Sequence, residues 1–396
     1  MEPSERADLV IVGGAIIGSS VATFLAQHPD WSGRIVVVER DPTYRTSSTT
    51  LSAASIRQQF STPLNIEISR FGVELIKDLD RWLGVDGAAP PQIDFVEGGY
   101  LFLATPPGLA ILQRNHAVQR EHAVQVVLLH PDQLRDRFPW LRVDGLAAGS
   151  LGLADEGWFD AYALLQAFRR KARSLRVEYV TGTVNAIERD GSTLLGVRLD
   201  DGRRIATERL VNAAGPRAAE VAAMAELQLP VHPRKRNIYH FDCRTRLGPT
   251  PLVIAPSGVY FRPEGESWIA GYSPREGEPD PDTLDLEVDR RLFDDFIWPE
   301  LAAVVPAFES VRLLGAWAGH YEVNTVDHNA VIGPHPELPD FLFANGFSGH
   351  GLQQAPAVGR GLAELIATGH YQTLDLSPLG YERIAHNRPI RELNVV

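Results

Sequence analysis

The sequence predicts an α/β protein in which a Rossmann-like dinucleotide-binding domain is interleaved with a second domain. Three observations support this. A strand, a glycine loop and a helix open the chain, an apolar strand ending in an acidic residue follows, and a second strand–glycine loop–helix unit lies near the C-terminus. At 396 residues the chain is long enough to bury two hydrophobic cores. We therefore expect two domains.

The first predicted unit is "ADLVIVGGAIIGSSVATFLAQ", residues 7–27. A buried strand over Asp8 to Val12 leads into a tight turn and then a helix with apolar residues at helical spacing. The run from Leu9 to Ala26 carries no charge and approaches the length of a membrane span. Glycines and serines interrupt it, and acidic residues precede it where a signal peptide would be basic. We expect no membrane span.

The loop of this unit nearly matches the G-x-G-x-x-G fingerprint. Gly13 and Gly18 occupy the first and third glycine positions, and Ala15 stands between them. Such glycines let the backbone approach a pyrophosphate, and the helix start offers unpaired N–H groups. The next strand, "RIVVVER", ends near Glu39, where the fingerprint expects an acid that binds a ribose. A β-turn-α unit without a ligand is the alternative, but the loop and Glu39 together favour a dinucleotide.

Two later regions complete the predicted nucleotide-binding domain. Residues 176–212 read as short strands separated by Asp-Gly turns, ending in the apolar strand of "RLVNAAGPRA". A strand over Phe341 to Ala344 leads into the glycine loop of "NGFSGHG" and a helix. The basic cluster His232 to Asn237 is expected to begin a strand of the second domain. We assign residues 1–94, 151–229 and 325–396 to the nucleotide-binding domain, and residues 95–150 and 230–324 to an inserted substrate domain.

Composition excludes several classes of function. The formal net charge of -12 argues against a nucleic-acid partner and an anionic membrane surface. The one cysteine, Cys243, excludes an intrachain disulfide, and the twelve histidines show no paired-ligand spacing. We expect no metal site and a cytoplasmic location.

Six motifs in order carry a family resemblance: "VIVGGAIIGSS", "VVVERD", "TTLSAASIRQQFSTPLNIEIS", "LVNAAGPRA", "WAGHYEVNTVDHNAVIG" and "GFSGHGLQQAPAVGRGLAELI". The chain resembles the FAD-dependent D-amino-acid/sarcosine/glycine oxidase superfamily over essentially its whole length. Within it, the chain is most similar to the FAD-dependent oxidoreductase domain-containing protein 1 group. The resemblance implies a Rossmann-like FAD-binding domain, an interleaved α+β substrate domain built on an antiparallel sheet, and oxidation of a C–N bond beside a carboxylate.

The resemblance also implies which residues bind FAD. The first glycine loop would hold the pyrophosphate, and Glu39 would bind the adenosine ribose. The polar loop after Glu39 would line the diphosphate and the flavin edge. Val184 would lie at the adenine, and the second glycine loop would surround the isoalloxazine. The implied cofactor-binding residues are Gly13, Gly14, Ala15, Ile16, Ile17, Gly18, Glu39, Arg40, Thr46, Ser47, Ser48, Ser52, Ala53, Val184, Ala213, Ala214, Gly215, Gly346, Gly349, His350, Gly351, Leu352 and Gln353.

Departures from the family pattern predict a noncovalent FAD. Sarcosine oxidases link the flavin to a cysteine in the segment matching "WAGHYEVNT", where this chain has Gly319, His320 and Tyr321. The histidine that anchors FAD in some sarcosine dehydrogenases is also missing from "RTSSTTLSAAS". Neither linkage of the family is therefore expected.

Other departures change the predicted substrate site. The lysine that meets the substrate carboxylate in sarcosine oxidases falls on Gln353, the lysine credited with oxygen activation falls near Tyr260, and the glycine-oxidase arginine falls on Tyr321. Arg57, in "SIRQQF", remains as the carboxylate partner, with the two tyrosines and the glutamine as hydrogen-bonding partners. His350 is the fifth residue of the predicted substrate site. The alternatives are a salt bridge at a domain seam for Arg57 and a hydrogen-bonded loop histidine for His350.

The predicted function is oxidation of a small amino acid or N-substituted amino acid, with hydride transfer to flavin N5 and hydrolysis of the resulting imine. The electron acceptor would be oxygen or a carrier. The alternative is an FAD-binding scaffold that helps to assemble a partner complex with little amine turnover, because the nearest group includes a respiratory-complex assembly factor. An NAD-dependent dehydrogenase is disfavoured because that fold does not need the second glycine loop.

Overall fold

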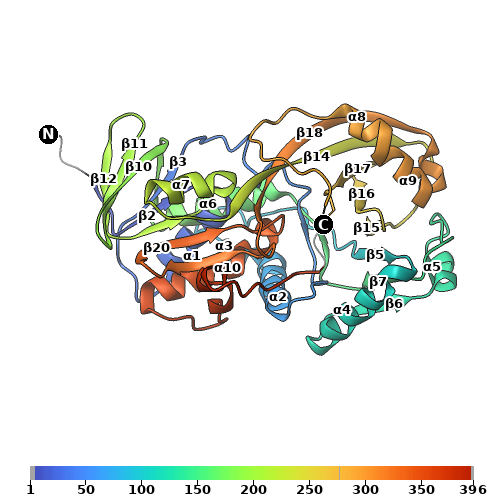
Figure 1. Cartoon of the computed structure of the whole chain (residues 1–396), viewed down its shortest axis with the longest axis horizontal. Helices are drawn as coiled ribbons and strands as arrows, with labels where there is room; N and C mark the ends of the chain where they lie inside the picture. The colour runs from blue at the N-terminus through green and yellow to red at the C-terminus, as the bar shows by residue number, and fades with distance from the viewer. Residues whose placement is uncertain (1–4, 276, 394–396) are drawn as a thin grey trace.

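A computed structural model describes residues 5–275 and 277–393 of the chain. Its strands form two large sheets that lie next to each other, a mixed six-stranded sheet on the left of Figure 1 and an eight-stranded sheet on the right. The predicted α/β fold with an interleaved α+β domain is confirmed.

The six-stranded sheet has the order β19-β20-β13-β2-β3-β9. All its strands are parallel except β19, which pairs antiparallel with β20. The strands predicted from sequence are present, with ends that lie within three residues of the predicted ones. The bounds are β2 (Leu9–Val12), β3 (Ile35–Glu39), β9 (Glu178–Thr181), β13 (Leu210–Asn212), β19 (Val331–His335) and β20 (Leu338–Asn345).

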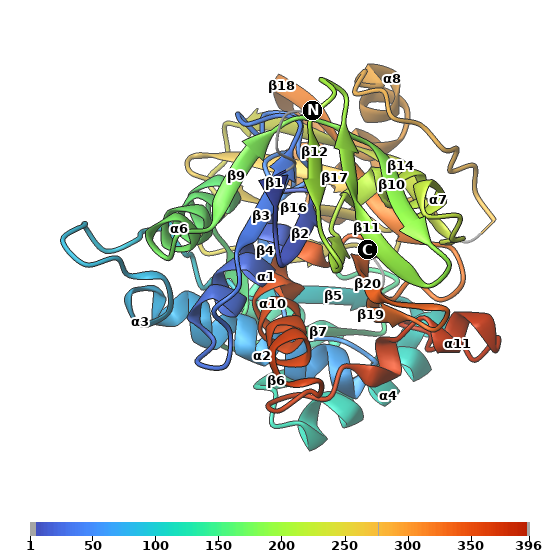
Figure 2. The same cartoon turned by 90° about the vertical axis from the view of Figure 1, so that its left-hand side faces the viewer.

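Both faces of this sheet are covered, which explains its uninterrupted apolar strands. On one face Ile11 and Val37 pack in a cluster with four helices, α1 (Ile16–Gln27), α2 (Pro63–Lys77), α6 (Ala161–Ser174) and α10 (Gly351–Thr368). On the other face Val10 and Val36 pack against α7 (Ala218–Met224) and a small sheet, visible in Figure 2. That sheet consists of β1 (Glu5–Arg6), β12 (Arg204–Ala206), β11 (Thr193–Leu199) and β10 (Val184–Asp190).

The eight-stranded sheet has the order β18-β14-β17-β16-β15-β5-β7-β6 and is antiparallel except where β15 meets β5. Its strands come from two separated parts of the chain, residues 100–152 and 231–324. The bounds are β5 (Tyr100–Ala104), β6 (Val126–Leu129), β7 (Ala148–Gly152), β14 (Val231–Cys243), β15 (Leu252–Ile254), β16 (Val259–Glu264), β17 (Ser267–Tyr272) and β18 (Val311–Asn324).

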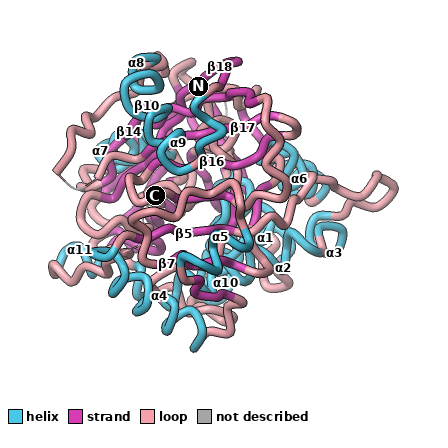
Figure 3. The backbone as a smooth tube through the Cα atoms, turned by 90° about the vertical axis from the view of Figure 1, so that its right-hand side faces the viewer, coloured by secondary structure: helices cyan, strands magenta, loops and turns pink. Residues whose placement is uncertain are grey.

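Short helices lie around this sheet, as Figure 3 shows from the right-hand side. They are α4 (Leu109–Glu121), α5 (Pro131–Arg137), α8 (Arg290–Leu292) and α9 (Trp298–Val304). Two further helices, α3 (Leu79–Leu83) and α11 (Glu382–Ala385), belong to the other half, and β4 (Ser55–Ile56) pairs with β8 (Gly157–Trp158). Within residues 5–275 and 277–393, no helix has the length and apolar character needed to cross a bilayer.

The long strands β14 and β18 connect the two halves of the molecule. They pair along their whole lengths, from Val231 opposite Asn324 to Cys243 opposite Val311, and run across the upper part of Figure 1. The basic cluster that was expected to begin a strand lies in the first half of β14. Residues of these two strands therefore reach from the eight-stranded sheet to the edge of the nucleotide-binding half.

Candidate cofactor and substrate site

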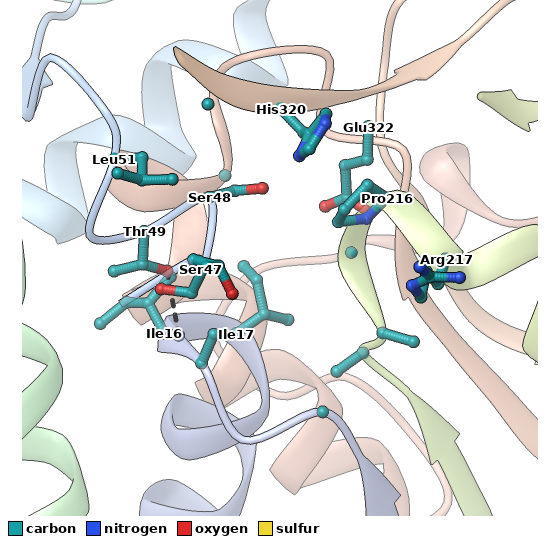
Figure 4. A pocket seen from close by; sticks show the side chains of 18 of the residues that line it. Ile16, Ile17, Ser47, Ser48, Thr49, Leu51, Pro216, Arg217, His320 and Glu322 are labelled. Carbon is teal, nitrogen blue, oxygen red and sulfur yellow. Dashed lines mark hydrogen bonds between the residues drawn. The ribbon is translucent and has the colours of Figure 1, made fainter. Parts of the chain in front are cut away.

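A cavity of about 510 Å³ lies between the two halves. The carboxyl ends of β2, β3 and β13 border it on one side, and β14, β16 and β18 border it on the other. Ligands of open parallel sheets bind at the carboxyl ends of the strands. Figure 4 shows the middle of this cavity, with Ser47 and Ser48 on one side and His320 and Glu322 on the other.

The first glycine loop fits closely between a strand and a helix. Gly13 has a φ of 100°, which favours glycine, and a Cβ there would lie 2.3 Å from the carbonyl oxygen of Ala213. A Cβ at Gly18 would lie 1.9 Å from the carbonyl oxygen of Gly13. Ala15 is the N-cap of α1 with φ -68° and ψ -163°, angles that any residue adopts, and it lines the cavity. The middle position of the fingerprint therefore does not require glycine here.

Glu39 ends β3 at the wall of the cavity and is held by the backbone. Its Oε2 accepts a hydrogen bond from the N–H of Gly14 at 2.8 Å, and its Oε1 accepts one from the N–H of Asp41 at 2.8 Å. Each carboxylate oxygen has more than one acceptor site, so Glu39 retains capacity for a ligand. The carboxylate thus also fixes the shape of the glycine loop.

The polar loop after β3 forms another wall. Thr46, Ser47, Ser48 and Ser52 all line the cavity. The hydroxyl of Thr49 accepts a hydrogen bond from the N–H of Ile16 at 3.3 Å, the dashed line in Figure 4. This contact connects the loop to the first turn of α1.

The second glycine loop leads into α10, which begins at Gly351. Gly349 has a φ of 96°, and a Cβ there would lie 2.5 Å from the ring of Tyr321. Gly349, Gly351 and Leu352 line the cavity. Close packing of the loop on Tyr321 therefore joins the nucleotide-binding half to β18.

The eight-stranded sheet contributes polar groups to the opposite wall. Tyr260 comes from β16, Tyr321 from β18 and Arg236 from β14. Burial raises the pKa of both tyrosines, so their hydroxyls stay protonated and can donate hydrogen bonds at neutral pH. The guanidinium carbon of Arg236 lies 5.1 Å from the centre of the Tyr321 ring. Leu284 and Leu286, in the loop before α8, complete this wall.

Arg57, His350 and Gln353 lie together behind the wall of the cavity. Arg57 is 2% exposed, and its guanidinium carbon lies 4.7 Å from the centre of the Phe60 ring. Its Nη2 lies 3.0 Å from Nε2 of His350, and its backbone N–H donates to Oε1 of Gln353 at 2.9 Å. Burial lowers the pKa of His350, and the charge of Arg57 lowers it further. The structure thus brings three of the predicted site residues into contact.

A buried carboxyl group, Glu156, holds the segment next to Arg57. Its Oε1 accepts hydrogen bonds from the N–H groups of Gln58 at 2.7 Å and Gln59 at 3.1 Å. Burial raises the pKa of Glu156 to about 7. This contact fixes the backbone from which the Arg57 side chain extends.

The predicted site residues fall into two groups. Those that line the cavity are Gly13, Ala15, Ile16, Ile17, Glu39, Arg40, Thr46, Ser47, Ser48, Ser52, Ala53, Val184, Ala213, Ala214, Gly215, Tyr260, Tyr321, Gly349, Gly351 and Leu352. Those that do not line it are Gly14, Gly18, Arg57, Gly346, His350 and Gln353. What each does toward a ligand stays a prediction.

Sequence reasoning missed five charged residues on the cavity wall, Asp41, Arg217, Glu220, Arg236 and Glu322, of which the last two lie on strands of the eight-stranded sheet. Burial raises the pKa of Glu322 to about 8. Strand alternation could have singled out Arg236, because alternate residues of the cluster His232 to Asn237 share one face of β14. Glu322 adjoins the predicted Tyr321 in sequence but has no motif of its own.

FAD, the cofactor that the resemblance implies, fits the residues that are present. Ser48 Oγ and Glu322 Oε2 are buried on the cavity wall and have no hydrogen-bond partner in the part of the chain that the structure describes. Buried polar atoms normally have a partner, so a polar ligand would satisfy them. The volume of about 510 Å³ is typical of a cofactor pocket. Glu39 and the first turn of α1 offer groups suited to a ribose and a pyrophosphate.

Comparison with known proteins identifies the family. The family described as FAD dependent oxidoreductase matches residues 8–365. FAD-dependent oxidoreductase domain-containing protein 1 of Xenopus laevis is 43% identical, with 100% of this chain and 86% of that protein aligned. The mitochondrial dimethylglycine dehydrogenase of Homo sapiens is 25% identical, over 95% of this chain and 44% of that protein. The crystal structure of L-proline dehydrogenase from P. horikoshii has a TM-score of 0.86 at 27% identity, covering 98% of this chain and 100% of that one. The chain therefore belongs to the FAD dependent oxidoreductase family, and FAD is its cofactor.

Proposed function

We propose that the chain oxidises the C–N bond of a small amino acid or N-substituted amino acid. One observation carries this proposal: the glycine loop and Glu39 of the nucleotide-binding half face the same cavity as Tyr260 and Tyr321 of the other half. A substrate held by the tyrosines would therefore lie beside a cofactor held by the glycine loop. Two of the similar proteins support this substrate class, since they are named as dehydrogenases of L-proline and of dimethylglycine.

The protein's own residues would bind and orient the substrate. When bound, FAD supplies at N5 the acceptor of a hydride equivalent from the C–H beside the amine, which leaves an imine that hydrolyses. Tyr260 and Tyr321 would donate hydrogen bonds to the substrate carboxylate, since burial keeps both hydroxyls protonated. Arg57 would supply the pairing positive charge from behind the wall, oriented by His350 and Gln353. We assign no protein base, because an amine that binds unprotonated does not need one.

Anaerobic mixing tests this proposal. FAD-loaded protein is mixed with a panel of amino acids and N-methylated amino acids, and the oxidised flavin absorbance is followed. We expect at least one of these compounds to bleach the flavin, and readmitted oxygen or an added carrier to restore it. The two acceptors then distinguish an oxidase from a dehydrogenase. A flavin that light reduces but that no member of the panel reduces would contradict the proposal and favour the FAD-binding scaffold.

A further inference from the structure

An acidic strap lies along the basic half of β14. We define the strap as residues 280–289, between β17 and α8. Asp285 pairs with Lys235 at 2.6 Å, and Asp282 pairs with Arg234 and, at 2.7 Å, with His232. Leu284 and Leu286, on either side of Asp285, line the cavity. The strap is thus part of the cavity wall, and both ion pairs and hydrogen bonds, such as that from the N–H of Thr283 to the carbonyl oxygen of Pro233 at 3.2 Å, attach it to β14.

One pair of the strap involves a cation on the cavity wall. Nη1 and Nη2 of Arg236 donate to Oδ1 and Oδ2 of Asp280, each at 2.8 Å. Nη1 also donates to the carbonyl oxygen of Lys235 at 2.9 Å, while Nε is buried and has no hydrogen-bond partner among the described residues. The Arg236 side chain is 8% exposed, whereas that of Asp280 is 25% exposed. The carboxylate of Asp280 thus occupies both terminal nitrogens of Arg236, a residue that lines the cavity.

Two contacts favour an exchange at Arg236: one holds its guanidinium, and the other offers Asp280 a second cation. The Tyr321 ring packs on Arg236 and would hold it at the wall. Oδ2 of Asp280 also lies 3.5 Å from Nε of Arg234, so a displaced Asp280 keeps a cation partner there. Exchange of one bidentate carboxylate for another leaves the charge beside Arg236 unchanged.

Arg57 provides a second guanidinium near the same tyrosine. Burial raises the pKa of Tyr321, and the charges of Arg236 and Arg57 both oppose this rise. The tyrosine is therefore within electrostatic range of both arginines. A substrate held at Tyr321 would meet the positive charge of both arginines.

We propose that the substrate is an amino acid with a second carboxylate, which Arg236 binds in exchange for Asp280. This inference rests on the proposed function, because it extends the same substrate site. One carboxylate of the substrate interacts with Arg57 and the tyrosine hydroxyls, and the other takes the forked face of Arg236. Amino acids with an acidic side chain, or with a carboxyalkyl group on nitrogen, have the required chemistry.

Binding of simple carboxylates to FAD-loaded protein tests the inference. Succinate and glutarate are titrated against butyrate, and the Kd is read from the perturbation of the flavin absorbance. We expect the wild-type protein to bind a dicarboxylate at least about tenfold more tightly, the contribution of a charged hydrogen-bonded pair. D280N removes the competing carboxylate and should tighten dicarboxylate binding about tenfold further, with little change for butyrate.

Two variants serve as controls. D285N breaks the strap contact to the side chain of Lys235, a residue outside the cavity, without freeing Arg234, and should leave each Kd close to wild type. The R236Q/D280N double variant removes both charges of the pair and should abolish the dicarboxylate preference. Melting temperatures and FAD content report whether each variant folds. If D280N does not fold, the inference is tested by whether the wild-type protein binds dicarboxylates more tightly than butyrate.

The failure of this inference can be distinguished from failure of the proposed function. Two results would contradict the inference: equal binding of butyrate and the dicarboxylates by the wild-type protein, or weaker binding of dicarboxylates by D280N than by the wild type. Either result would mean that the Arg236–Asp280 pair is a structural contact only. Amino-acid oxidation could still be observed in that case. If neither class of carboxylate perturbs the flavin and no amine reduces it, both proposals are overturned.

Discussion

The guanidinium of Arg57 donates a hydrogen bond to His350, with 3.0 Å between Nη2 and Nε2. Arginine can only donate, so Nε2 must be the accepting, unprotonated nitrogen of the imidazole. His350 is therefore neutral, in agreement with the lowering of its pKa by burial and by Arg57. His350 orients the charge of Arg57 and adds none of its own.

Replacement of Arg57 by alanine should reduce kcat/KM by roughly thirty- to several-thousandfold on the best substrate found. Loss of one partner of a desolvated charge pair costs about 2–5 kcal/mol. Arg57→Lys should recover only part of the activity, because lysine lacks the planar fork that reaches His350 and a carboxylate together. Steady-state kinetics of the three proteins measure the effect.

The burial of Arg57 between aromatic rings makes stability the necessary control. Its guanidinium carbon lies 4.7 Å and 5.1 Å from the centres of the Phe60 and Phe102 rings. A substrate role requires FAD content and melting temperature close to wild type. Loss of FAD, unfolding or full turnover in Arg57→Ala would instead place the substrate carboxylate elsewhere.

Replacement of Glu39 by alanine should weaken FAD binding by roughly ten- to a hundredfold. A hydrogen bond to a charged group contributes about 1.5–3 kcal/mol. Part of the effect would come from the loop, because Glu39 also accepts from the N–H of Gly14 at 2.8 Å. Fluorescence titration of the FAD-free protein gives the dissociation constants, and Glu39→Gln, which keeps one oxygen acceptor, should lie between wild type and alanine. An unchanged constant in a folded Glu39→Ala protein would count against the ribose role.

The nucleotide-binding half was predictable because its signals are local. Strand, turn and helix follow one another at fixed spacing around Gly13 and Gly18, and burial on both faces makes strands such as Ile35–Glu39 continuously apolar. Glycine is needed at both positions because a Cβ there would collide with a backbone carbonyl oxygen. A requirement of this kind is visible in the sequence as a glycine at fixed spacing.

The substrate wall was less predictable because it depends on contacts distant in sequence. Arg57 meets His350 across 293 positions, and burial behind the wall cannot be read from the "SIRQQF" motif. Arg236 reaches the cavity only through the pairing and twist of β14 and β18, and its partner Asp280 lies on a loop without a regular pattern. A basic cluster in a sequence indicates charge but not the groups that pair with it.

FAD should dissociate from the acid-denatured protein. Cys243, the one cysteine of the chain, donates to the carbonyl oxygen of Ala307 at 3.3 Å and does not line the cavity. His320 does line it, but its Nε2 donates to the carbonyl oxygen of Asp285 at 3.0 Å, so this nitrogen is not available for a bond to the flavin. Precipitation with acid should release all the flavin into the supernatant as FAD, as identified by chromatography. Yellow colour that remains with the washed pellet would refute this prediction.

The stability of the FAD-free protein should fall as pH rises from about 5 to about 7, in part because of Glu156. Burial raises the pKa of this carboxyl from the ordinary 4.5 to about 7. Between these values the folded protein binds more protons than the unfolded chain, so the free energy of unfolding decreases with pH. The contribution is at most about 3 kcal/mol, and it is fully present only below the unfolded pKa.

Urea unfolding at several pH values measures this contribution. Glu156→Gln cannot ionise and should make the free energy of unfolding less dependent on pH across the same window. The amide oxygen can still accept from the backbone N–H groups of Gln58 and Gln59, which keeps the segment beside Arg57 attached. The new amide NH2 replaces Oε2, so the hydrogen bond from Nε2 of Gln59 at 2.9 Å is lost. Matched slopes in the wild type and the variant would mean that Glu156 is ionised in the folded protein at pH 5, and that the buried charge of Arg57 compensates it more fully than its burial suggests.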